Sequence, residues 1–345
     1  MEINAKILTP EDGILSRNID DYPEGIIIPI DKPYRWTSAD VIRKVKFAAI
    51  RHFGKKNLKV GHAGTLDPLA TGVLLVCIGK ATKLAETLQA HHKEYVAGIT
   101  FGATTPSYDL EKEIDRFFPH EHITAEKVAG TLPSFLGEQD QIAPLFSAKS
   151  VDGVRAYELA RKLYKAQTAV EAVASGAPGQ SGDSQAVIDE VAAELIRVSR
   201  INITELELLE FTASGSDGLE NRASPLAAGG GAHSTGVGGV VFQPVTPDAE
   251  DKVQVSAASS RINVTDNSAL GLPRAVVRIA CSKGTYIRAF ARDLGEALDS
   301  GAHLDNLQRS RSGIFRVEKA LTVDQTISIL QKEPDNTLID NTLPK

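Results

Sequence analysis

The sequence is poor in cysteine and has no long apolar run. Its two cysteines, Cys77 and Cys281, lie far apart in the chain, so a disulfide framework and a zinc ribbon are both excluded. No apolar segment approaches the roughly 20 residues needed to cross a bilayer, and the start, MEINAKILTPEDG, lacks the basic and apolar regions of a signal peptide. These absences predict a protein of the reducing cytoplasm that does not enter a membrane.

Acidic residues outnumber basic residues, so the 345 residues carry a net charge of −6. The acidic excess lies in two stretches: residues 167–196 have a net charge of −5 and residues 213–273 one of −3. In contrast, the run 43–59, RKVKFAAIRHFGKKNLK, has seven Lys or Arg and no acid. This run is the strongest candidate for contact with phosphate, and the alternative is a solvated face.

The two acidic stretches have the composition of insertions. From 213 to 239, 17 of 27 residues are Gly, Ala or Ser, which predicts a flexible loop because little apolar burial offsets the lost backbone entropy. Strand-like composition at 240–245 and 261–264 predicts a strand pair, and the Ala-rich residues 167–192 predict a partial helix. We expect an N-terminal extension over 1–24, one main domain over 25–325 with insertions at about 167–196 and 213–273, and a short tail over 326–345.

Periodicity in the rest of the chain predicts strands mixed with helices. Residues 25–30 predict a short buried strand, residues 94–101 a strand with one side buried, and residues 274–281 a further strand. Thr37 or Ser38 can cap a helix, and a second helix follows the turn at 282–284. Their apolar residues keep a period of 3.6: Val41, Ile42, Val45 and Ala49 in the first, and Ile287, Phe290, Leu294 and Leu298 in the second. This mixture predicts an α+β domain around a mixed, largely antiparallel sheet flanked by helices.

Several familiar catalytic motifs are absent from the sequence. The segment from Gly72 to Lys80 has six residues between its glycines and Ala81 after the lysine, which does not fit a Walker loop. No G-x-G-x-x-G follows a strand, and no G-x-S-x-G is present. The cluster His120–Glu121–His122 has no second ligand pair at a workable spacing, so we expect no metal site.

One segment does carry a chemical signal. Residues 61–72, GHAGTLDPLATG, directly follow the basic run, and their three glycines and one proline predict an irregular loop that a ligand can approach closely. Asp67 lies in the middle of this loop. An Asp before Pro is often only a turn former, but the apolar residues around it favour a partly desolvated carboxylate that needs a cation nearby: Leu66, Leu69, Val73, Leu74 and Leu75.

The loop resembles the signature of the TruB family of tRNA pseudouridine synthases. Five further blocks match in the family's order: DKPYRWTS at 31–38, KEYVAGITFG at 93–102, PLFSAKSVDGVRAYELAR at 144–161, CSKGTYIRAFARDLG at 281–295 and LQRSRSGIF at 307–315. The resemblance implies the pseudouridine synthase fold and isomerisation of uridine-55 in the T loop of tRNA. The main domain over 25–325 would then be the catalytic domain.

The resemblance implies roles for four residues at the reacting base. Asp67 is implied as the carboxylate that attacks the ribose of the target uridine or starts proton removal there, and Tyr95 as the aromatic residue that stacks on the flipped uracil. Arg288 is implied as the cation paired with Asp67, and its position in the first turn of a helix, where the macrodipole disfavours a cation, agrees with such a partner. His62 is implied to fill the space that the flipped base leaves. The alternatives from the residues alone are a core tyrosine, a surface arginine and a hydrogen-bonded loop histidine.

Further residues are expected to contact RNA phosphate or ribose. They lie in the matching blocks and in the basic run: Lys32, Lys149, Lys283 and Arg309, and Arg43, Lys44, Lys55 and Lys56. Because the reaction is an isomerisation without net redox change, the resemblance implies no cofactor and no metal. The expected partner is the T stem-loop of tRNA, and we expect a cytoplasmic monomer that needs neither a membrane nor a protein partner.

The sequence departs from the family pattern in three places. Arg35 replaces the glycine of K-P-x-G-x-T-S, which leaves the geometry of that turn open, and Ala143–Pro144 replaces a double proline. Only about 30 residues follow Phe315, too few for the C-terminal RNA-binding PUA module that bacterial members commonly carry. We therefore expect the catalytic domain to bind RNA alone.

Two other functions stay open on the sequence. A chain of this fold could bind and fold tRNA without turnover, although the presence of Asp67, Tyr95 and Arg288 favours catalysis. A related synthase could act on ribosomal or guide-directed RNA, and the expected lack of a PUA module argues against the guide-directed class.

Overall fold

The computed structural model describes residues 3–144, 150–151, 154–155, 198–215 and 262–331, which form two compact units. The first unit takes the chain up to His91 and again from Arg309, and the second takes residues 92–308. The sequence predicts a single main domain over 25–325 instead, and the boundaries of that domain stay a prediction. None of the helices described is long and apolar enough to span a membrane.

The first unit is built on a sheet in which β4 is central. β4 is antiparallel to both β2 and β3, and all nine of its residues are buried. β1, in the segment expected as an N-terminal extension, pairs with β2 in parallel, and Ile30 forms an isolated parallel bridge with Leu321. Eight further strand pairs, including those of β4 with β2 and β3, are antiparallel. The strands of this unit are β1 (Lys6–Ile7), β2 (Ile26–Lys32), β3 (Val60–Ala63), β4 (Ala70–Ile78) and β14 (Phe315–Arg316).

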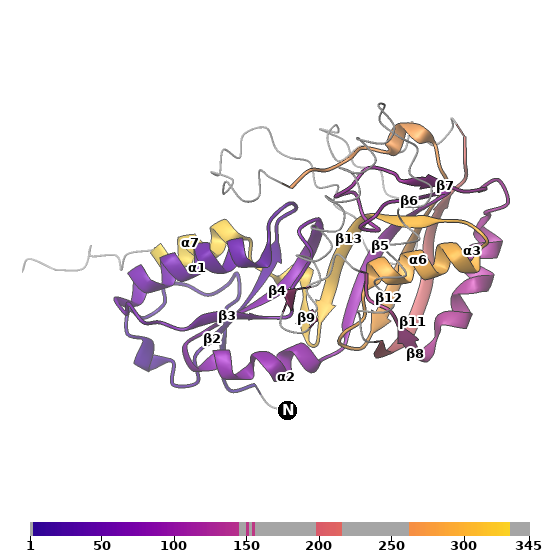
Figure 1. Ribbon diagram of the computed structural model, residues 1–345. Coiled ribbons are helices and arrows are strands. Elements are labelled where there is room, and N and C mark those ends of the chain that lie inside the picture. The colour runs from indigo at the N-terminus through magenta and orange to yellow at the C-terminus, as the bar shows by residue number, and fades with distance from the viewer. Residues whose placement is uncertain (1–2, 145–149, 152–153, 156–197, 216–261, 332–345) are drawn as a thin grey trace, which may run out of the picture. The chain divides into compact units, whose positions relative to one another are not determined.

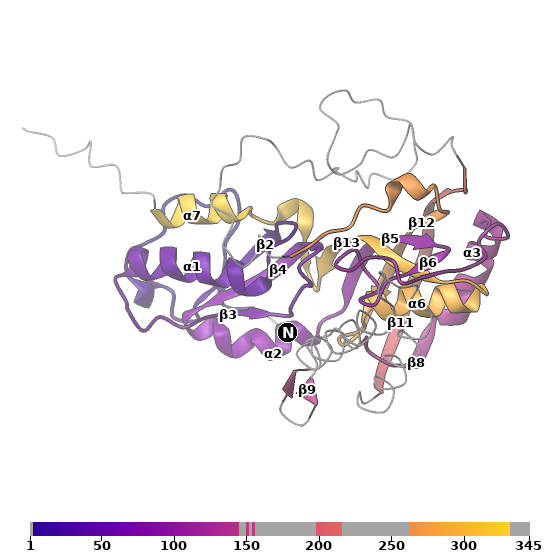
Figure 2. The ribbon, with the colours of Figure 1, turned by 45° about the horizontal axis from the view of Figure 1, so that its top comes forward.

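Helices cover both faces of this sheet, with α1 and α7 on one face and α2 on the other (Figures 1 and 2). The predicted start of α1 is confirmed, because the Thr37 hydroxyl accepts the N–H of Asp40 and the Asp40 carboxylate accepts the N–H of Thr37. α7 crosses the boundary expected at residue 325. The helices are α1 (Ser38–Phe53), α2 (Ala85–Ala90) and α7 (Val323–Gln331), with 3-10 turns η1 (Ile19–Asp21), η2 (Gly79–Leu84) and η7 (Val317–Lys319).

The second unit is a sheet in the order β13-β5-β12-β11-β8, with β13 running on into the first unit from Arg309. α6 packs against β5 and α3 against β11, and the rings of Phe135 and Phe290 meet edge to face at 5.4 Å between centroids. The strands are β5 (Lys93–Phe101), β6 (Ala103–Thr104), β7 (Arg116–Phe117), β8 (Gly137–Gln141), β9 (Ser150–Val151), β10 (Val154–Arg155), β11 (Ser199–Thr212), β12 (Arg274–Cys281) and β13 (Ala302–Ser312). The helices are α3 (Ala125–Thr131) and α6 (Ile287–Ala297), with 3-10 turns η3 (Leu132–Phe135) and η6 (Ser268–Leu270).

Most of the predicted elements that fall on described residues are confirmed, namely those seen as β2, α1, β5, β12 and α6. The prediction of one buried side for β5 is wrong, because both of its faces are buried. An ion pair between Arg274 and Asp305, with Nε to Oδ2 at 2.6 Å, lies over Gly98 and covers the second face at that residue. The α+β class with a mixed, largely antiparallel sheet is confirmed.

The insertions expected from composition are described only in part. Residues 262–264 have no regular structure, so the strand predicted at 261–264 is wrong for these three residues. Thr265, next in the chain, donates its backbone N–H to the carbonyl of Leu110 at 2.9 Å, which ties this irregular segment to a loop rather than to a sheet edge. The other expectations for the insertions, at 167–192, 216–239, 240–245 and residue 261, lie outside the described residues.

Candidate active site

The loop that carries Asp67 is shorter than the sequence predicts. β3 extends through Ala63 and β4 begins at Ala70, so the irregular part is residues 64–69 rather than 61–72. The expected burial around it is confirmed, because Leu66 and Leu69 are buried and β4 is buried throughout. Asp67 itself is half-buried. A short loop between two paired strands restricts where this carboxylate can lie.

Two polar side chains from other elements bind the backbone on either side of Asp67. The hydroxyl of Ser38, at the start of α1, accepts the N–H of Leu66 at 3.0 Å and lies 3.3 Å from the carbonyl oxygen of Leu66. The ammonium group of Lys32 donates to the carbonyl of Pro68 at 3.1 Å. Both neighbours of Asp67 are therefore fixed, and its backbone has little freedom to turn.

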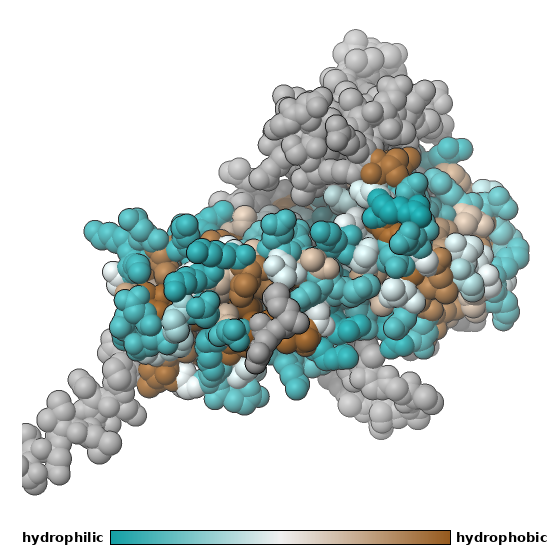
Figure 3. Space-filling view, turned by 90° about the horizontal axis from the view of Figure 1, so that it is seen from below, coloured by the Kyte–Doolittle hydropathy of each residue, from teal (hydrophilic) through white to brown (hydrophobic). Residues whose placement is uncertain are grey.

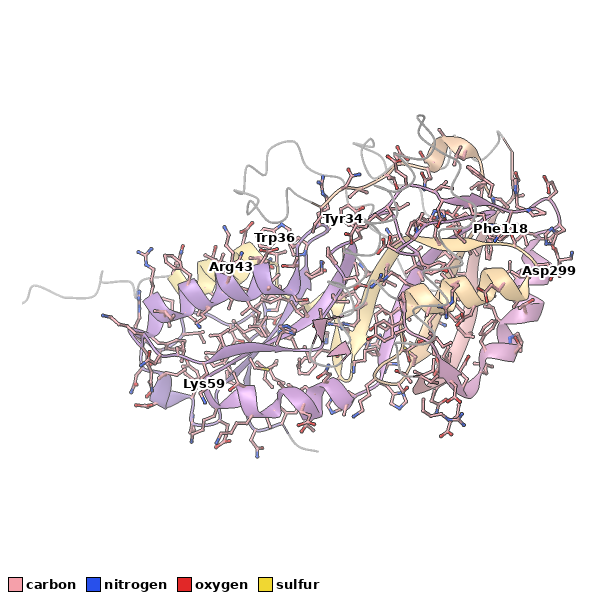
Figure 4. The ribbon with its side chains drawn as sticks, viewed as in Figure 1. Tyr34, Trp36, Arg43, Lys59, Phe118 and Asp299 are labelled. Carbon is pink, nitrogen blue, oxygen red and sulfur yellow. The ribbon has the colours of Figure 1, made fainter. Side chains whose placement is uncertain are left out.

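Lys32 is fully buried and holds the turn at 33–36 as well as the Asp67 loop. Its ammonium group donates to the carbonyls of Pro33 at 3.0 Å and Trp36 at 2.6 Å. Trp36 lies next to the start of α1 (Figure 4). Burial lowers the pKa of Lys32 to about 7, although the nearby carboxylates of Asp67 and Asp31 oppose the shift. The structure thus gives this lysine three carbonyl partners in place of the phosphate expected from the sequence.

Arg309 is the second expected RNA contact that the structure places in the interior, at 2 % exposure. Its guanidinium donates to the carbonyl of Val73 at 2.7 Å through Nε and to the carbonyl of Gly64 at 3.1 Å through Nη2. A planar guanidinium can bridge two such carbonyls because its donors point in fixed directions. Arg309 therefore ties the first residue of the loop to β4.

Gly72 is required where β4 passes under Arg309. Its φ is +97°, and a Cβ at this position would collide with the backbone of Arg309. Its N–H donates to the carboxylate of Asp31 at 2.9 Å. Burial raises the pKa of Asp31, and this hydrogen bond opposes the shift.

We expect Gly72→Ala to lower the free energy of unfolding by about 3 kcal/mol, from left-handed strain plus overpacking. Gly54→Ala is the matched control, because Gly54 also has a positive φ of +61° but nothing lies within 4 Å of its added Cβ. The control variant therefore measures only the strain of a left-handed backbone, which we expect to lower the free energy of unfolding by about 1 kcal/mol. Urea titrations of the two variants measure the difference, and equal losses would contradict the proposed close approach to Arg309.

The remaining expected residues of the first unit lie in several environments. His62 is half-buried, and burial together with Arg309 lowers its pKa, which favours a neutral ring. Arg43 forms an ion pair with Asp40 at 2.7 Å, Lys44 is half-buried, and Lys55 and Lys56 are exposed after the end of α1.

Arg35, which departs from the family pattern, adopts a backbone conformation that suits a glycine. Arg35 has a φ of +63°, the left-handed conformation that a glycine adopts most easily. The arginine therefore adopts the left-handed conformation at this turn, with a backbone strain of roughly 1 kcal/mol.

The second unit holds the other two expected catalytic residues. Tyr95 lies on β5 opposite Ile279 of β12 and is 9 % exposed. Arg288 lies in the first turn of α6, as predicted, and is 4 % exposed. Its pairing with Asp67 would join residues of different units, and it stays a prediction. Lys283 is exposed before α6, and Lys149 lies outside the described residues.

The surroundings of Arg288 include residues that the sequence patterns do not reveal. Its Nη1 donates to the carbonyl of Ser107 at 3.0 Å, and its Nε lies 3.7 Å from the carboxylate of Asp109. The Ser107 hydroxyl donates to Asp109 at 2.6 Å, and Tyr108 between them has a φ of +55°. In the sequence, these residues appear only as a polar run directly after the KEYVAGITFG block. Because this run has neither helical nor strand periodicity, no element is predicted there.

Two expected absences concern metals and disulfides. Within the described ranges, no group of three or more His, Cys, Asp or Glu side chains is placed to hold a metal ion. His122 instead lies with Nε2 at 2.7 Å from the carbonyl of Leu298. Cys77 and Cys281 are both buried, and neither forms a disulfide bond.

Comparison with known proteins adds three findings. The family model for the N-terminal domain of TruB family pseudouridylate synthases matches residues 51–174. The chain is 39 % identical over 304 residues to tRNA pseudouridine synthase B of Phocaeicola vulgatus, covering 88 % of this chain and 92 % of the relative. It is 33 % identical to the protein of the same name from Thermus thermophilus, covering 85 % of this chain and 75 % of the relative.

A solved structure described as a Cbf5-Nop10-Gar1 complex is also similar, at 21 % identity and a TM-score of 0.45, covering 91 % of this chain and 57 % of that chain. The two relatives are at least 33 % identical to this chain, and each match covers at least 85 % of it. The chain therefore belongs to the TruB family of pseudouridylate synthases.

Proposed function

We propose that this chain converts uridine-55 in the T loop of tRNA to pseudouridine. The observation that carries the proposal is the fixed loop of Asp67 in a chain of the TruB family, whose relatives are named tRNA pseudouridine synthase B. Ser38 and Lys32 hold the backbone on both sides of the carboxylate, and Arg309 holds the start of the loop. A carboxylate positioned before substrate arrives saves the entropy of orienting it during the reaction.

The proposed reaction begins when the target uridine leaves its stack, at a cost of a few kcal/mol. Asp67 then attacks the ribose or starts proton removal there, and the N1–C1′ bond breaks. The uracil turns and a C5–C1′ bond forms, while the bond between Asp67 and the ribose breaks or the abstracted proton returns to the ribose. The proton at C5 is then lost and N1 is protonated. Product and substrate have the same atoms and the same oxidation state, so Asp67 is regenerated without an oxidant or a second substrate.

The other expected residues take supporting roles in this proposal. Tyr95 stacks on the flipped uracil, His62 fills the space that the base leaves, and Arg288 pairs with the Asp67 carboxylate. A neutral histidine suits insertion between bases, and the lowered pKa of His62 favours that form. We further propose that the chain is cytoplasmic and that it acts as a monomer. Light scattering of the purified protein would test the monomeric state.

The experiment is incubation of the purified chain with an unmodified tRNA transcript, followed by mapping of pseudouridine at each nucleotide. We expect modification at position 55 and none in a transcript with cytidine at that position. A ribosomal RNA fragment tests the related-synthase alternative in parallel. Modification of that fragment but not of tRNA would overturn the proposal, and tight tRNA binding without any product would favour the tRNA-folding alternative.

A further inference from the structure

The first unit has a hollowed, strongly basic surface that the proposed reaction does not use. Three parts of the chain line it: the later turns of α1 with the loop that follows, the 3-10 helix η2, and the residues around η1. Four of its lysines belong to the basic run 43–59, and two, on η2, are not among the RNA contacts expected from the sequence. The lysine groove is defined by six residues: Lys46, Lys55, Lys56, Lys59, Lys80 and Lys83.

The backbone beneath the lysine groove is held in place by the fold. Gly79, at the start of η2, donates its N–H to the carbonyl of Lys59 at 2.8 Å, which joins two of the lining segments. Thr82 donates its hydroxyl to the carbonyl of Gly79 at 2.8 Å, and Leu58 is buried under the loop. The lysines therefore extend from a preformed surface, so a ligand would not need to order the backbone.

The charge of the lysine groove is not neutralised by the protein. All six lysines are exposed, and none has an ion-pair partner among the residues that the structure describes. Asp20 is the only carboxylate among the residues that line it. Six ammonium groups, four from α1 and the loop that follows and two from η2, repel one another, and a ligand with several negative charges would relieve that repulsion. Hydrophilic residues also cover much of the face shown in Figure 3.

The lysine groove lies away from Asp67 within the same unit. The Asp67 loop contacts the N-terminal end of α1 through Ser38, whereas Lys55 and Lys56 follow its C-terminal end. The 16 residues of α1 span about 24 Å. Figure 4 shows Lys59 and Trp36 on opposite sides of this unit. At roughly 3 Å per base pair, an RNA held at Asp67 must extend by about eight base pairs to reach Lys55 and Lys56, at the end of the lysine groove beyond α1.

We propose that the lysine groove binds the sugar-phosphate backbone of tRNA at a point outside the T stem-loop. This inference rests on the proposed function, which supplies the RNA. A nucleic-acid backbone fits the groove because it offers evenly spaced single charges to the several lysines that line it, and it requires no base-specific shape. The second contact would increase affinity for whole tRNA over an isolated hairpin.

The test is a charge reversal on η2, Lys80→Glu with Lys83→Glu, compared with Lys127→Glu and Lys319→Glu, two exposed lysines outside the groove. Binding is measured over a range of salt concentrations with whole tRNA and with a hairpin of the T stem and loop only. We expect the η2 variant to bind tRNA about tenfold more weakly at 0.1 M salt, with a log–log salt slope shallower by about one to two. Its affinity for the hairpin should change by less than about twofold, and thermal melting checks that it is folded.

Three results would overturn the inference: unchanged tRNA binding, equal loss on tRNA and hairpin, or an equal loss in the control variant. The proposed function fails separately. If the parent chain forms no pseudouridine but binds tRNA with the expected dependence on Lys80 and Lys83, the groove is supported and the isomerase proposal is not.

Discussion

Replacement of Asp67 by asparagine is expected to abolish pseudouridine formation while tRNA binding stays within about tenfold of the parent. Asparagine keeps the size of the side chain but can neither attack the ribose nor accept a proton as a carboxylate does, so we expect the single-turnover rate to fall at least about 100-fold. The loop should survive, because its anchors are backbone groups: Ser38 binds Leu66, and Lys32 binds Pro68.

Asp67→Ala and Asp31→Asn complete this experiment. The alanine variant has no route back to aspartate, whereas the asparagine can deamidate and restore a trace of parent enzyme. Asp31→Asn is the matched control, since it removes a neighbouring carboxylate and leaves an oxygen to accept the N–H of Gly72. We expect this control to keep at least about a tenth of the rate. Turnover above about 1 % of the parent in Asp67→Ala would rule out the carboxylate's proposed role.

Lys32→Met is expected to impair both the fold and the reaction. Methionine has a similar length but donates no hydrogen bond, so three buried carbonyls, at Pro33, Trp36 and Pro68, lose their shared donor. We expect the free energy of unfolding to fall by about 2 kcal/mol. The Asp67 loop loses one of its anchors, and a displacement of about 1 Å would lower the single-turnover rate roughly 100-fold. Lys46→Met, on the exposed side of α1, is the control for stability and rate on the hairpin substrate.

The pH dependence of this variant tests the buried state of Lys32. The pKa is about 7 in the folded protein and about 10.5 in the unfolded chain, so between these values the unfolded chain binds more protons. The unfolding free energy of the parent therefore rises with pH in this window, by up to about 1.4 kcal/mol per pH unit. Lys32→Met lacks this contribution, so its deficit should grow between pH 7 and pH 9. Urea titrations that show a constant or shrinking deficit would contradict the shifted pKa.

Local patterns predict the elements of this fold well where the signal is carried by neighbours in the sequence. The capping residue Thr37 and the apolar spacing of α1 involve residues within a few turns of one another, and the alternation at 94–101 sits within one strand. The burial of the second face of β5 depends instead on Arg274 and Asp305, far along the chain. Such a contact does not affect the alternation of apolar residues along the strand. Alternation alone therefore predicts that the second face of β5 is exposed to solvent.

The candidate site shows the same limit. Motif resemblance finds Asp67, Tyr95 and Arg288, but it does not distinguish a cation that faces RNA from one that binds backbone carbonyls. Lys32 and Arg309 have the composition of phosphate contacts, yet both are buried and hold the loop. Burial of a cation requires acceptors from several segments at once, and only the assembled fold shows whether those acceptors are present.

The first unit is formed by two separate segments of the chain, which are synthesised at different times. The strands around Asp67 leave the ribosome early, but Arg309, which binds the carbonyls of Gly64 and Val73, follows more than 200 residues later. At about 5–20 residues per second, this interval is roughly 10 to 50 s. The second unit is one continuous segment and can complete its sheet up to Gln308 first. A nascent chain released before Arg309 would carry every candidate catalytic residue and still lack the arginine that binds the loop, so we expect the site to form only after Arg309 has been synthesised.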